Sequence, residues 1–363
     1  MSSRQSGDRL KFEVSTSPDS EEWDAFVSMA TCGHFMQSYA WGIFQRDAGW
    51  DARYLLWRDD TRICAAALLL SRKVPLLSDQ LFYVPRGPIL NYVDAAMLAM
   101  VEEDLSAYLI EQKAFFLRSD PYLNSADFIS DSLILPESVK VSRDWSYWNA
   151  PKLVLWLNLQ REENEIFKGM TATCRNEVQR GYRSGVEFTQ GGPDGLDDFY
   201  QLMAVTGQHK GIAVHDLEYY RRLFALDNKS LQIQLFFGRF EGAAITTGIS
   251  LKYGKKAWLL YAASSPDSYK LRANRTLQWE MIKWAHAEGC ERYDFRGTAT
   301  SDPPSPDDPG YGVYEFKKSF GPDYIRLVGY YDLIQRPLIY RMFRVVEEKL
   351  LPTAYQLRTW LKK

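Results

Sequence analysis

Two halves of the chain repeat one pattern of apolar and polar positions. Each half has an apolar run, a polar turn, a longer apolar run that ends in a basic residue, and two further apolar runs, which predicts four strands. An amphipathic helix is predicted between the third and fourth strands, and Leu277, Met281 and Trp284 form its apolar stripe in the second half. The strand blocks are 53–73, 81–90 and 113–120, then 233–253, 258–267 and 290–297, with helices at 95–112 and 274–288.

This repeat predicts the fold class. Three strands, a helix and a fourth strand form the sequence outline of an acyltransferase domain of the GNAT type. We therefore expect an α/β (α+β) protein with two such domains in tandem. The length of 363 residues agrees with two domains, because single cores rarely grow beyond about 250–300 residues.

The helix after the third strand decides whether coenzyme A is an expected cofactor. In ordinary GNAT domains this helix begins with a glycine-rich loop whose backbone N–H groups hold the pyrophosphate. The corresponding segments here are NYVDAAM (91–97) and KLRANRT (270–276), and neither contains glycine, although Arg272 and Arg275 remain in the second. Use of acyl-CoA is therefore disfavoured, and no cofactor is expected.

Composition and charge exclude several classes of function. A net charge of −2 argues against a protein that coats nucleic acid over its whole surface, and we expect no DNA partner. The N-terminus has no apolar signal segment and the apolar run at 63–70 is too short to cross a membrane, so a cytoplasmic location is expected. The four cysteines are far apart, and neither metal-ligand spacing nor a hydrolase or nucleotide motif is found.

The segment GYGVYEFKKSFGP (310–322) can be read as a strand or as a short helix. Alternation would bury a lysine on a strand face, whereas helical spacing separates an apolar side from a polar one, and Gly321 and Pro322 are helix stop signals. We expect a helix, in whose last turn solvated lysines would complement the helix dipole. Its expected apolar side is Val313, Phe316 and Phe320, and the other side is Tyr314, Lys317 and Lys318.

A basic face is predicted on a helix near residues 168–183. Its four cations fall within an arc of about 140° at 100° per residue. Such a face could meet a phosphate backbone or an anionic membrane, or it is an ordinary solvated helix surface. The four residues are Lys168, Arg175, Arg180 and Arg183.

Segments spread over nearly the whole chain carry a resemblance to a known family. They are HFMQSYAWGIFQRDAGW (34–50), VPRGPIL (84–90), LRSDPY (117–122), TCRNEVQRGYRSGV (173–186), LQWEMIKWAHAEGCERYDFRG (277–297) and YEFKKSFG (314–321). Together they resemble the Fem family of peptidoglycan bridge-forming aminoacyltransferases. The resemblance implies tandem GNAT-like domains at 1–155 and 156–334, a C-terminal helix at 335–363 that completes the first, and no inserted coiled-coil arm.

The resemblance also implies a reaction. The family moves an amino acid from aminoacyl-tRNA to the stem-peptide amine of a peptidoglycan precursor, either lipid II or the UDP-linked pentapeptide. Positioning, a proton acceptor and stabilisation of an oxyanion suffice for this step. Two alternatives stay open: an acyl-CoA-dependent N-acyltransferase, and a non-catalytic protein that binds tRNA or an envelope precursor. Peripheral contact with the inner membrane face is a further expectation.

Three residues are candidates for catalysis. Asp120 follows a predicted strand and resembles the family's carboxylate near the acceptor amine, although an Asp-Pro pair also forms turns. Tyr261 lies toward the end of the predicted third strand of the second half, beside the acyl-transfer cleft, where its hydroxyl could donate to an oxyanion. Lys317 aligns with a lysine that the family keeps after phenylalanine, near the tRNA 3′ end or the ester. A buried core tyrosine and a solvated lysine are the structural alternatives.

Further residues are candidates for substrate binding. Tyr219 resembles a second cleft tyrosine, and His215 stands where some relatives place an arginine that grips the diphosphate of the precursor. A phosphate-binding lysine of relatives corresponds to a position near Gln45 or Arg46. These two departures weaken the case for a soluble UDP-linked acceptor and leave a lipid-linked one open. The other candidates are Arg86, Arg175, Arg183 and Phe316.

Overall fold

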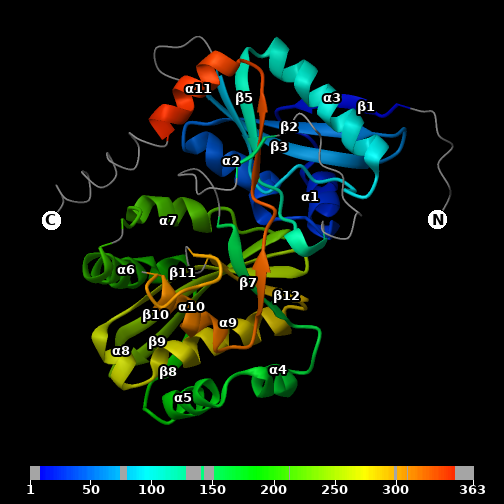
Figure 1. Ribbon diagram of the computed structural model, residues 1–363. Helices are drawn as coiled ribbons and strands as arrows, with labels where there is room; N and C mark the ends of the chain where they lie inside the picture. The colour runs from blue at the N-terminus through cyan, green and yellow to red at the C-terminus, as the bar shows by residue number, and fades with distance from the viewer. Residues whose placement is uncertain are drawn as a thin grey trace. The chain divides into compact units, whose positions relative to one another are not determined.

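The chain forms two compact units, each built around a seven-stranded sheet (Figure 1). The computed structural model describes residues 9–73, 80–127, 140–142, 151–211, 213–297, 301–308 and 310–347. The first unit comprises residues 1–150 and 327–354, and the second comprises 151–326 and 355–363. The domain boundaries expected from the sequence stay predictions, because compactness does not test whether each part folds independently.

The first unit has a mixed sheet in the order β1-β2-β3-β4-β5-β14-β6. All its neighbouring strands are antiparallel except β4 and β5, which are parallel because the helix α3 connects them. The strands are β1 (Lys11–Ser15), β2 (Asp51–Arg58), β3 (Ile63–Lys73), β4 (Gln80–Val84), β5 (Ala114–Ser119), β6 (Lys140–Ser142) and β14 (Tyr330–Ile334). The α-helices are α1 (Ser20–Met29), α2 (Tyr39–Asp47), α3 (Ala95–Glu111) and α11 (Pro337–Val345).

Two late segments of the chain return to the first unit. Strand β14 pairs antiparallel with β5, and α11 packs its apolar side against a cluster of Leu81, Phe115 and Phe116. The family resemblance implies this return for the last helix, but the added strand was not expected from the sequence. The predicted helical residues 348–363 lie outside the part of the chain that the structure describes.

A buried ion network holds this return in place. The Arg118 guanidinium on β5 donates to both carboxylate oxygens of Asp332 on β14, at 2.7 Å each, and to Glu347 beyond α11. Tyr340 on α11 also donates to Asp332, at 2.7 Å. Two carboxylates from the end of the chain therefore meet one buried arginine that lies more than 200 positions earlier, and they balance its charge.

The second unit has the sheet order β13-β7-β12-β11-β10-β9-β8. Its strands are β7 (Leu153–Asn158), β8 (Glu187–Gly191), β9 (Leu231–Phe240), β10 (Ala243–Tyr253), β11 (Lys256–Ser264), β12 (Arg292–Gly297) and β13 (Asp323–Arg326). Its α-helices are α4 (Glu163–Gly169), α5 (Ala172–Tyr182), α6 (Leu196–Lys210), α7 (Leu217–Phe224), α8 (Pro266–Lys270), α9 (Ala273–Ala287) and α10 (Tyr311–Lys318). Figure 1 shows α6 and α7 on one face of the sheet and α9 and α5 on the other.

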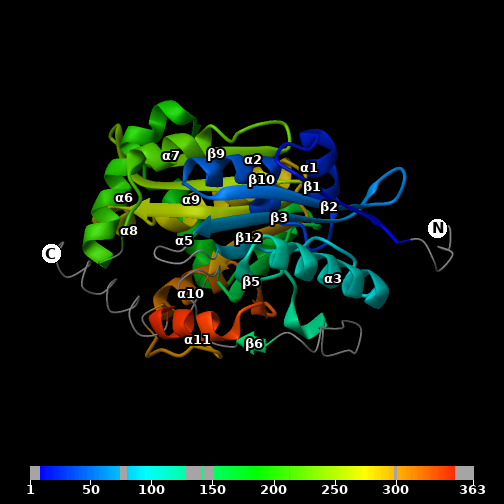
Figure 2. The ribbon, with the colours of Figure 1, turned by 90° about the horizontal axis from the view of Figure 1, so that it is seen from above.

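The repeat predicted from the sequence is confirmed. Strands β2 to β5 with α3 correspond to β9 to β12 with α9, and each lies within a few residues of its predicted block. In α9, the predicted stripe of Leu277, Met281 and Trp284 is buried in the core of the second unit, together with Phe320. Figure 2 shows β2 and β3 of the first unit running along each other, in agreement with their antiparallel pairing.

Two predictions about helices need correction. The segment 310–322 does form a helix, α10, but Val313 is 42% exposed, whereas Lys317 is only 9% exposed. The phase is therefore wrong, because Lys317 finds a partner on β12 that local spacing does not reveal. The basic face near 168–183 is divided between two helices: Lys168 lies in the last turn of α4, and Arg175 and Arg180 lie in α5.

Candidate functional site

In the sheet of the second unit, the neighbouring parallel strands β11 and β12 separate before they end. Strands β11 and β12 pair from Lys256–Trp258 to Arg292–Asp294, and the pairing stops there although both strands continue. Leu260 is an extra residue in the register of β11 against β10, which forms a bulge next to Tyr261. In α/β sheets, ligands bind beyond the carboxyl ends of strands at such points. The first unit differs, because β4 and β5 stay paired to their ends at Val84 and Ser119.

Two tyrosine hydroxyls meet on the α7 side of this opening. The hydroxyls of Tyr219 on α7 and Tyr261 on β11 lie 2.9 Å apart, and the His215 ring stacks on Tyr219 with centroids 3.8 Å apart. Burial raises the pKa of both tyrosines and lowers the pKa of His215, so all three side chains are neutral near pH 7. Since a hydroxyl that accepts a hydrogen bond keeps its own proton, the pair can still donate to an anionic oxygen.

A buried amine lies at the carboxyl end of β12. The Lys317 ammonium of α10 donates to the Gly297 carbonyl. The pKa of Lys317 is lowered to about 8, mainly by burial and also by the nearby positive charge of Arg296, while the Asp294 carboxylate opposes both effects. An amine of this kind exchanges its proton close to physiological pH, which suits a group that acts in proton transfer or charge stabilisation.

Arg296 connects the tyrosine pair with the lysine. It has φ = 61°, a left-handed conformation that a non-glycine residue adopts only when its surroundings enforce it. Its backbone N–H donates to the Asp294 carboxylate at 2.5 Å, and its guanidinium reaches the Leu260 carbonyl across the parted strands at 3.5 Å. The Arg296 charge lowers the pKa values of Tyr219, Tyr261 and Lys317, so all three groups lie within range of one cation.

In the first unit, Asp120 and Arg86 form a separate arrangement. Asp120 directly follows β5, as predicted, and its buried carboxylate accepts the Arg86 backbone N–H at 2.7 Å and the Tyr83 hydroxyl at 3.2 Å. The Arg86 guanidinium lies 3.9 Å from the same carboxylate, and Arg86 has a left-handed φ of 56°. These contacts give Asp120 a structural task, which is to hold the turn after β4.

A sequence model of the FemAB family matches residues 19–142, 142–235 and 239–348. The chain belongs to the FemAB family. The lipid II:glycine glycyltransferase of Staphylococcus haemolyticus is 23% identical over 94% of this chain and 98% of that protein. The enzyme of the same name from Staphylococcus aureus is 21% identical over the same shares. The first of these alignments spans 414 positions, more than the 363 residues of this chain, so that relative carries residues that this FemAB chain lacks.

Solved structures confirm the tandem fold. The crystal structure of FemX matches with a TM-score of 0.81 at 20% identity, over 91% of this chain and 99% of FemX. A tandem GNAT protein from the clavulanic acid biosynthesis pathway matches with a TM-score of 0.51 at 10% identity, over 89% and 98%. The FemAB chain therefore has two tandem GNAT-like halves, as its repeat predicts. Among the residues that the structure describes, no helix has both the length and the apolar character needed to span a membrane.

The remaining candidates of this FemAB chain bond mostly to backbone oxygens. Arg46 donates to the carbonyls of Thr16 and Ala52 and so ties the end of α2 to the sheet. Arg175 donates to the carbonyls of Lys168 and Met170, and Arg183 donates to that of Gln179 at 3.1 Å. Phe316 packs on Phe320 beneath the Arg275 guanidinium, 5.4 Å from its ring centroid. Their roles in substrate binding stay predictions.

The helix ends that hold pyrophosphate in ordinary GNAT domains are occupied by side chains here. At the start of α3, Asp94 caps the helix by accepting from the Met97 N–H at 3.0 Å, which places a negative charge where a diphosphate would lie. At the start of α9, Arg272 pairs with Glu177 at 3.5 Å and Arg275 pairs with the same carboxylate. Both contacts disfavour coenzyme A.

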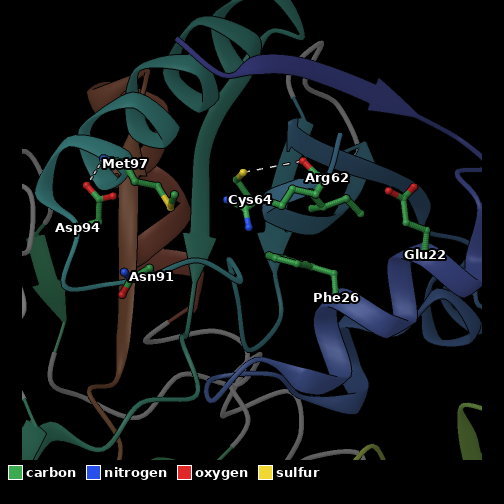
Figure 3. Close-up of a pocket in the computed structure, with 8 residues that line it drawn as sticks. Glu22, Phe26, Arg62, Cys64, Asn91, Asp94 and Met97 are labelled. Carbon is green, nitrogen blue, oxygen red and sulfur yellow. Dashed lines mark hydrogen bonds between the residues drawn. The ribbon is translucent and has the colours of Figure 1, made fainter. Parts of the chain in front are cut away.

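A pocket of about 590 Å³ lies elsewhere, in the first unit. Figure 3 shows its lining from α1, the start of β3 and the start of α3. Its charged groups already have partners: Arg58 binds both oxygens of Glu22 at 2.6 Å, Asp94 caps α3, and Arg62 bonds to Asp59 at 3.0 Å. None of the predicted site residues lines this pocket, so we do not place the active site there.

Arg296 is the residue that the reading of the sequence missed. It stands in the block 290–297, one residue before the end of a predicted strand, and that block aligns with the block that ends in Asp120. The sequence signal that could have identified Arg296 is therefore a charged residue near the end of a strand that the repeat contains in both halves. Its backbone conformation and its position between Tyr261 and Lys317 could be seen only in the structure.

Proposed function

We propose that the protein is an aminoacyltransferase that moves an amino acid from aminoacyl-tRNA to the stem-peptide amine of lipid II during formation of interpeptide bridges. The observation that carries this proposal is the group formed by Tyr219, Tyr261, Arg296 and Lys317 at the parting of β11 and β12, in a member of the FemAB family. The curated relatives named above are lipid II:glycine glycyltransferases, which supports lipid II as the acceptor.

The reaction joins an amine to an ester carbonyl. The amine nitrogen attacks the carbonyl carbon, the new C–N bond forms, the ester C–O bond breaks, and a proton from the amine ends on the released ribose oxygen. Negative charge develops on the carbonyl oxygen in the transition state. A hydrogen bond donated by the Tyr219–Tyr261 pair and the positive field of Arg296 would stabilise that oxygen. No covalent enzyme intermediate is required.

Lys317 would act near the end of the donor tRNA. Its ammonium is held by the Gly297 carbonyl in a buried position, so a phosphodiester or ester oxygen that approaches it meets a cation with little competing water. A pKa of about 8 would also allow it to pass a proton to the leaving ribose oxygen. Lys318, by contrast, is exposed and lies 3.8 Å from Glu315.

A lipid-linked acceptor would bring the enzyme to the inner face of the membrane. Helix α11 carries exposed apolar side chains on the side away from its buried contacts, with Leu338 75% and Met342 69% exposed. Such a surface is suited to contact with lipid. A cytoplasmic enzyme that contacts the membrane peripherally is therefore part of the proposal.

A product mass tests donor and acceptor together. The protein is incubated with a pool of charged tRNAs and with either lipid II or the UDP-linked pentapeptide, and the products are analysed by mass spectrometry. We expect the mass of one amino acid residue to be added to lipid II. Binding of aminoacyl-tRNA without its discharge would instead indicate a non-catalytic protein, and tight binding of coenzyme A in calorimetry would favour an acyl-CoA enzyme.

A further inference from the structure

One surface of the second unit carries positive charge that is not balanced by carboxylates. It consists of the four basic residues predicted from the sequence, and Arg180 and Arg183 are exposed in it. In the described part of the chain, none of the four forms an ion pair with a carboxylate, and the contacts of Arg175 and Arg183 go to backbone carbonyls. We call this surface the α5 basic face. It is made of Arg175, Arg180 and Arg183 on α5 and at its end, together with Lys168 of α4, whose carbonyl accepts from Arg175.

Two carboxylates beside α5 are occupied by cations from outside the α5 basic face. Glu177, on the inner side of α5, pairs with Arg272 and Arg275 of α9. Glu280 pairs with Lys283 at 2.8 Å and accepts a hydrogen bond from Tyr182. Neither of these two acids therefore forms an ion pair with a cation of the face.

The α5 basic face begins directly beside the helix that carries Lys317. The Thr171 N–H, at the start of α5, donates to the Ser319 carbonyl at the end of α10 at 2.9 Å. Arg275 lies over the Phe316 ring and its Nε lies 3.4 Å from the Ser319 hydroxyl. The start of α5 therefore lies directly beside the end of the helix that carries Lys317, where the tRNA 3′ end is proposed to lie.

From this adjacency and from the unbalanced charge of the face we infer that the α5 basic face binds the sugar-phosphate backbone of the acceptor arm of the donor tRNA, an inference that rests on the proposed function. Arg175 and Arg183 are eight residues apart, about 12 Å along a helix axis, a length that covers several nucleotides. The exposed positions between them are mainly polar, including Asn176 and Gln179, which suit phosphate and ribose oxygens. A membrane-binding helix would instead present an apolar face.

The chemistry of these contacts also predicts what the face cannot do. Arginines that meet phosphates fix the position of a nucleic acid but do not read its bases. The α5 basic face therefore binds different tRNAs with similar affinity. Selection of the amino acid must occur elsewhere, at the ester end of the tRNA.

The test compares two double variants in which equal charge is removed. Arg180→Ala with Arg183→Ala changes the face, whereas Arg53→Ala with Arg62→Ala removes the half-exposed Arg53 and the exposed Arg62 from the first unit. Affinity for uncharged tRNA and for an acceptor-stem minihelix RNA is measured by fluorescence anisotropy between 50 and 200 mM salt. We expect the face variant to bind about tenfold more weakly at low salt, with a salt slope smaller by about 1.4–1.8 for two lost contacts. The control should bind like the wild type.

Three results would overturn the inference. They are equal weakening of RNA binding in both double variants, unchanged RNA binding in the face variant, and a loss of binding in the face variant that is seen only with phosphatidylglycerol vesicles.

The outcome of this test is separable from that of the proposed function. If the wild type transfers an amino acid but the face variant binds RNA normally, only this inference fails. If RNA binding depends on the face but no tRNA is ever discharged, only the proposed function fails. Unchanged melting temperatures show that both variants are folded.

Discussion

At the scale of single residues, Lys317 shows how burial changes the meaning of a sequence pattern. Local spacing placed this lysine with solvated neighbours, but the Gly297 carbonyl gives it a buried partner from a strand 20 positions earlier. Because a contact at this separation leaves no mark in helical periodicity, the helix was predictable and its phase was not. Lys318, the neighbour assigned to solvent, is indeed exposed.

Burial of Lys317 predicts a dependence of stability on pH. The folded pKa is about 8 and the unfolded value is 10.5, so between these values the unfolded state binds more protons. The free energy of unfolding contributed by this group therefore rises as pH increases from 8 to 10.5. Urea unfolding of the wild type and of Lys317→Met at pH 7.5 and pH 9.5 tests this. The free energy of unfolding of the wild type, relative to that of Lys317→Met, should be higher at pH 9.5 than at pH 7.5. An identical difference at both pH values would contradict it.

The tyrosine pair should behave as a unit in catalysis. Tyr219→Phe and Tyr261→Phe each remove one hydroxyl of a 2.9 Å contact, and each should lower turnover by roughly 10²-fold. Since the two hydroxyls share one hydrogen bond, the double variant should lose less than the product of the single effects. Tyr269→Phe, at an exposed position on α8, is the matched control. Multiplicative losses would show that the two hydroxyls act independently.

Asp120 should affect folding as well as activity. Its carboxylate accepts the buried Arg86 N–H and the Tyr83 hydroxyl, so Asp120→Asn should cost about 1–3 kcal/mol of stability. Chemical unfolding measures this cost, and transfer is then compared per folded molecule. A stable variant that lost turnover would indicate that the carboxylate acts in the chemistry and not in the turn.

At the scale of secondary structure elements, the strands and helices of the repeat could be predicted, but their additions could not. Apolar periodicity records which side of an element is buried, so the four-strand pattern and α9 were visible in the sequence. Strand β14 was not, because it joins a sheet whose other strands lie about 190 to 320 positions earlier in the chain. The bulge at Leu260, in the pairing of β11 with β10, likewise depends on pairing partners.

The contribution of the buried ion network to the attachment of β14 and α11 to the first unit can be measured as a change in the free energy of unfolding. Asp332→Asn removes one of the two carboxylate charges that balance the buried Arg118. Removal of one partner of a buried ion pair lowers the free energy of unfolding by about 3–5 kcal/mol. The melting temperature should therefore fall by several degrees. Tyr340→Phe removes only a neutral donor to the same carboxylate and should cost about 1 kcal/mol. Equal effects of the two substitutions would show that the charge pairing is not what holds β14 and α11.

At the scale of the whole molecule, the tandem architecture and the family were accessible from sequence because both depend on patterns that extend over hundreds of residues. The site was only partly accessible. Tyr219, Tyr261 and Lys317 were identified through resemblance, whereas Arg296 was missed because its role depends on a left-handed backbone between two parted strands. Arg86 and Asp120 were both identified as candidates, but their mutual contact emerged only from the fold.

The central claim is that the group around Lys317 transfers an amino acid from tRNA. Single-turnover transfer from aminoacyl-tRNA to lipid II, measured for the wild type, Lys317→Met and Lys318→Met, tests it most directly. We predict rapid transfer by the wild type and Lys318→Met, and a loss of about 10²-fold or more in Lys317→Met with no fall in its melting temperature at pH 7.5. Equal, mild effects of the two substitutions, or no transfer by the wild type, would contradict the account.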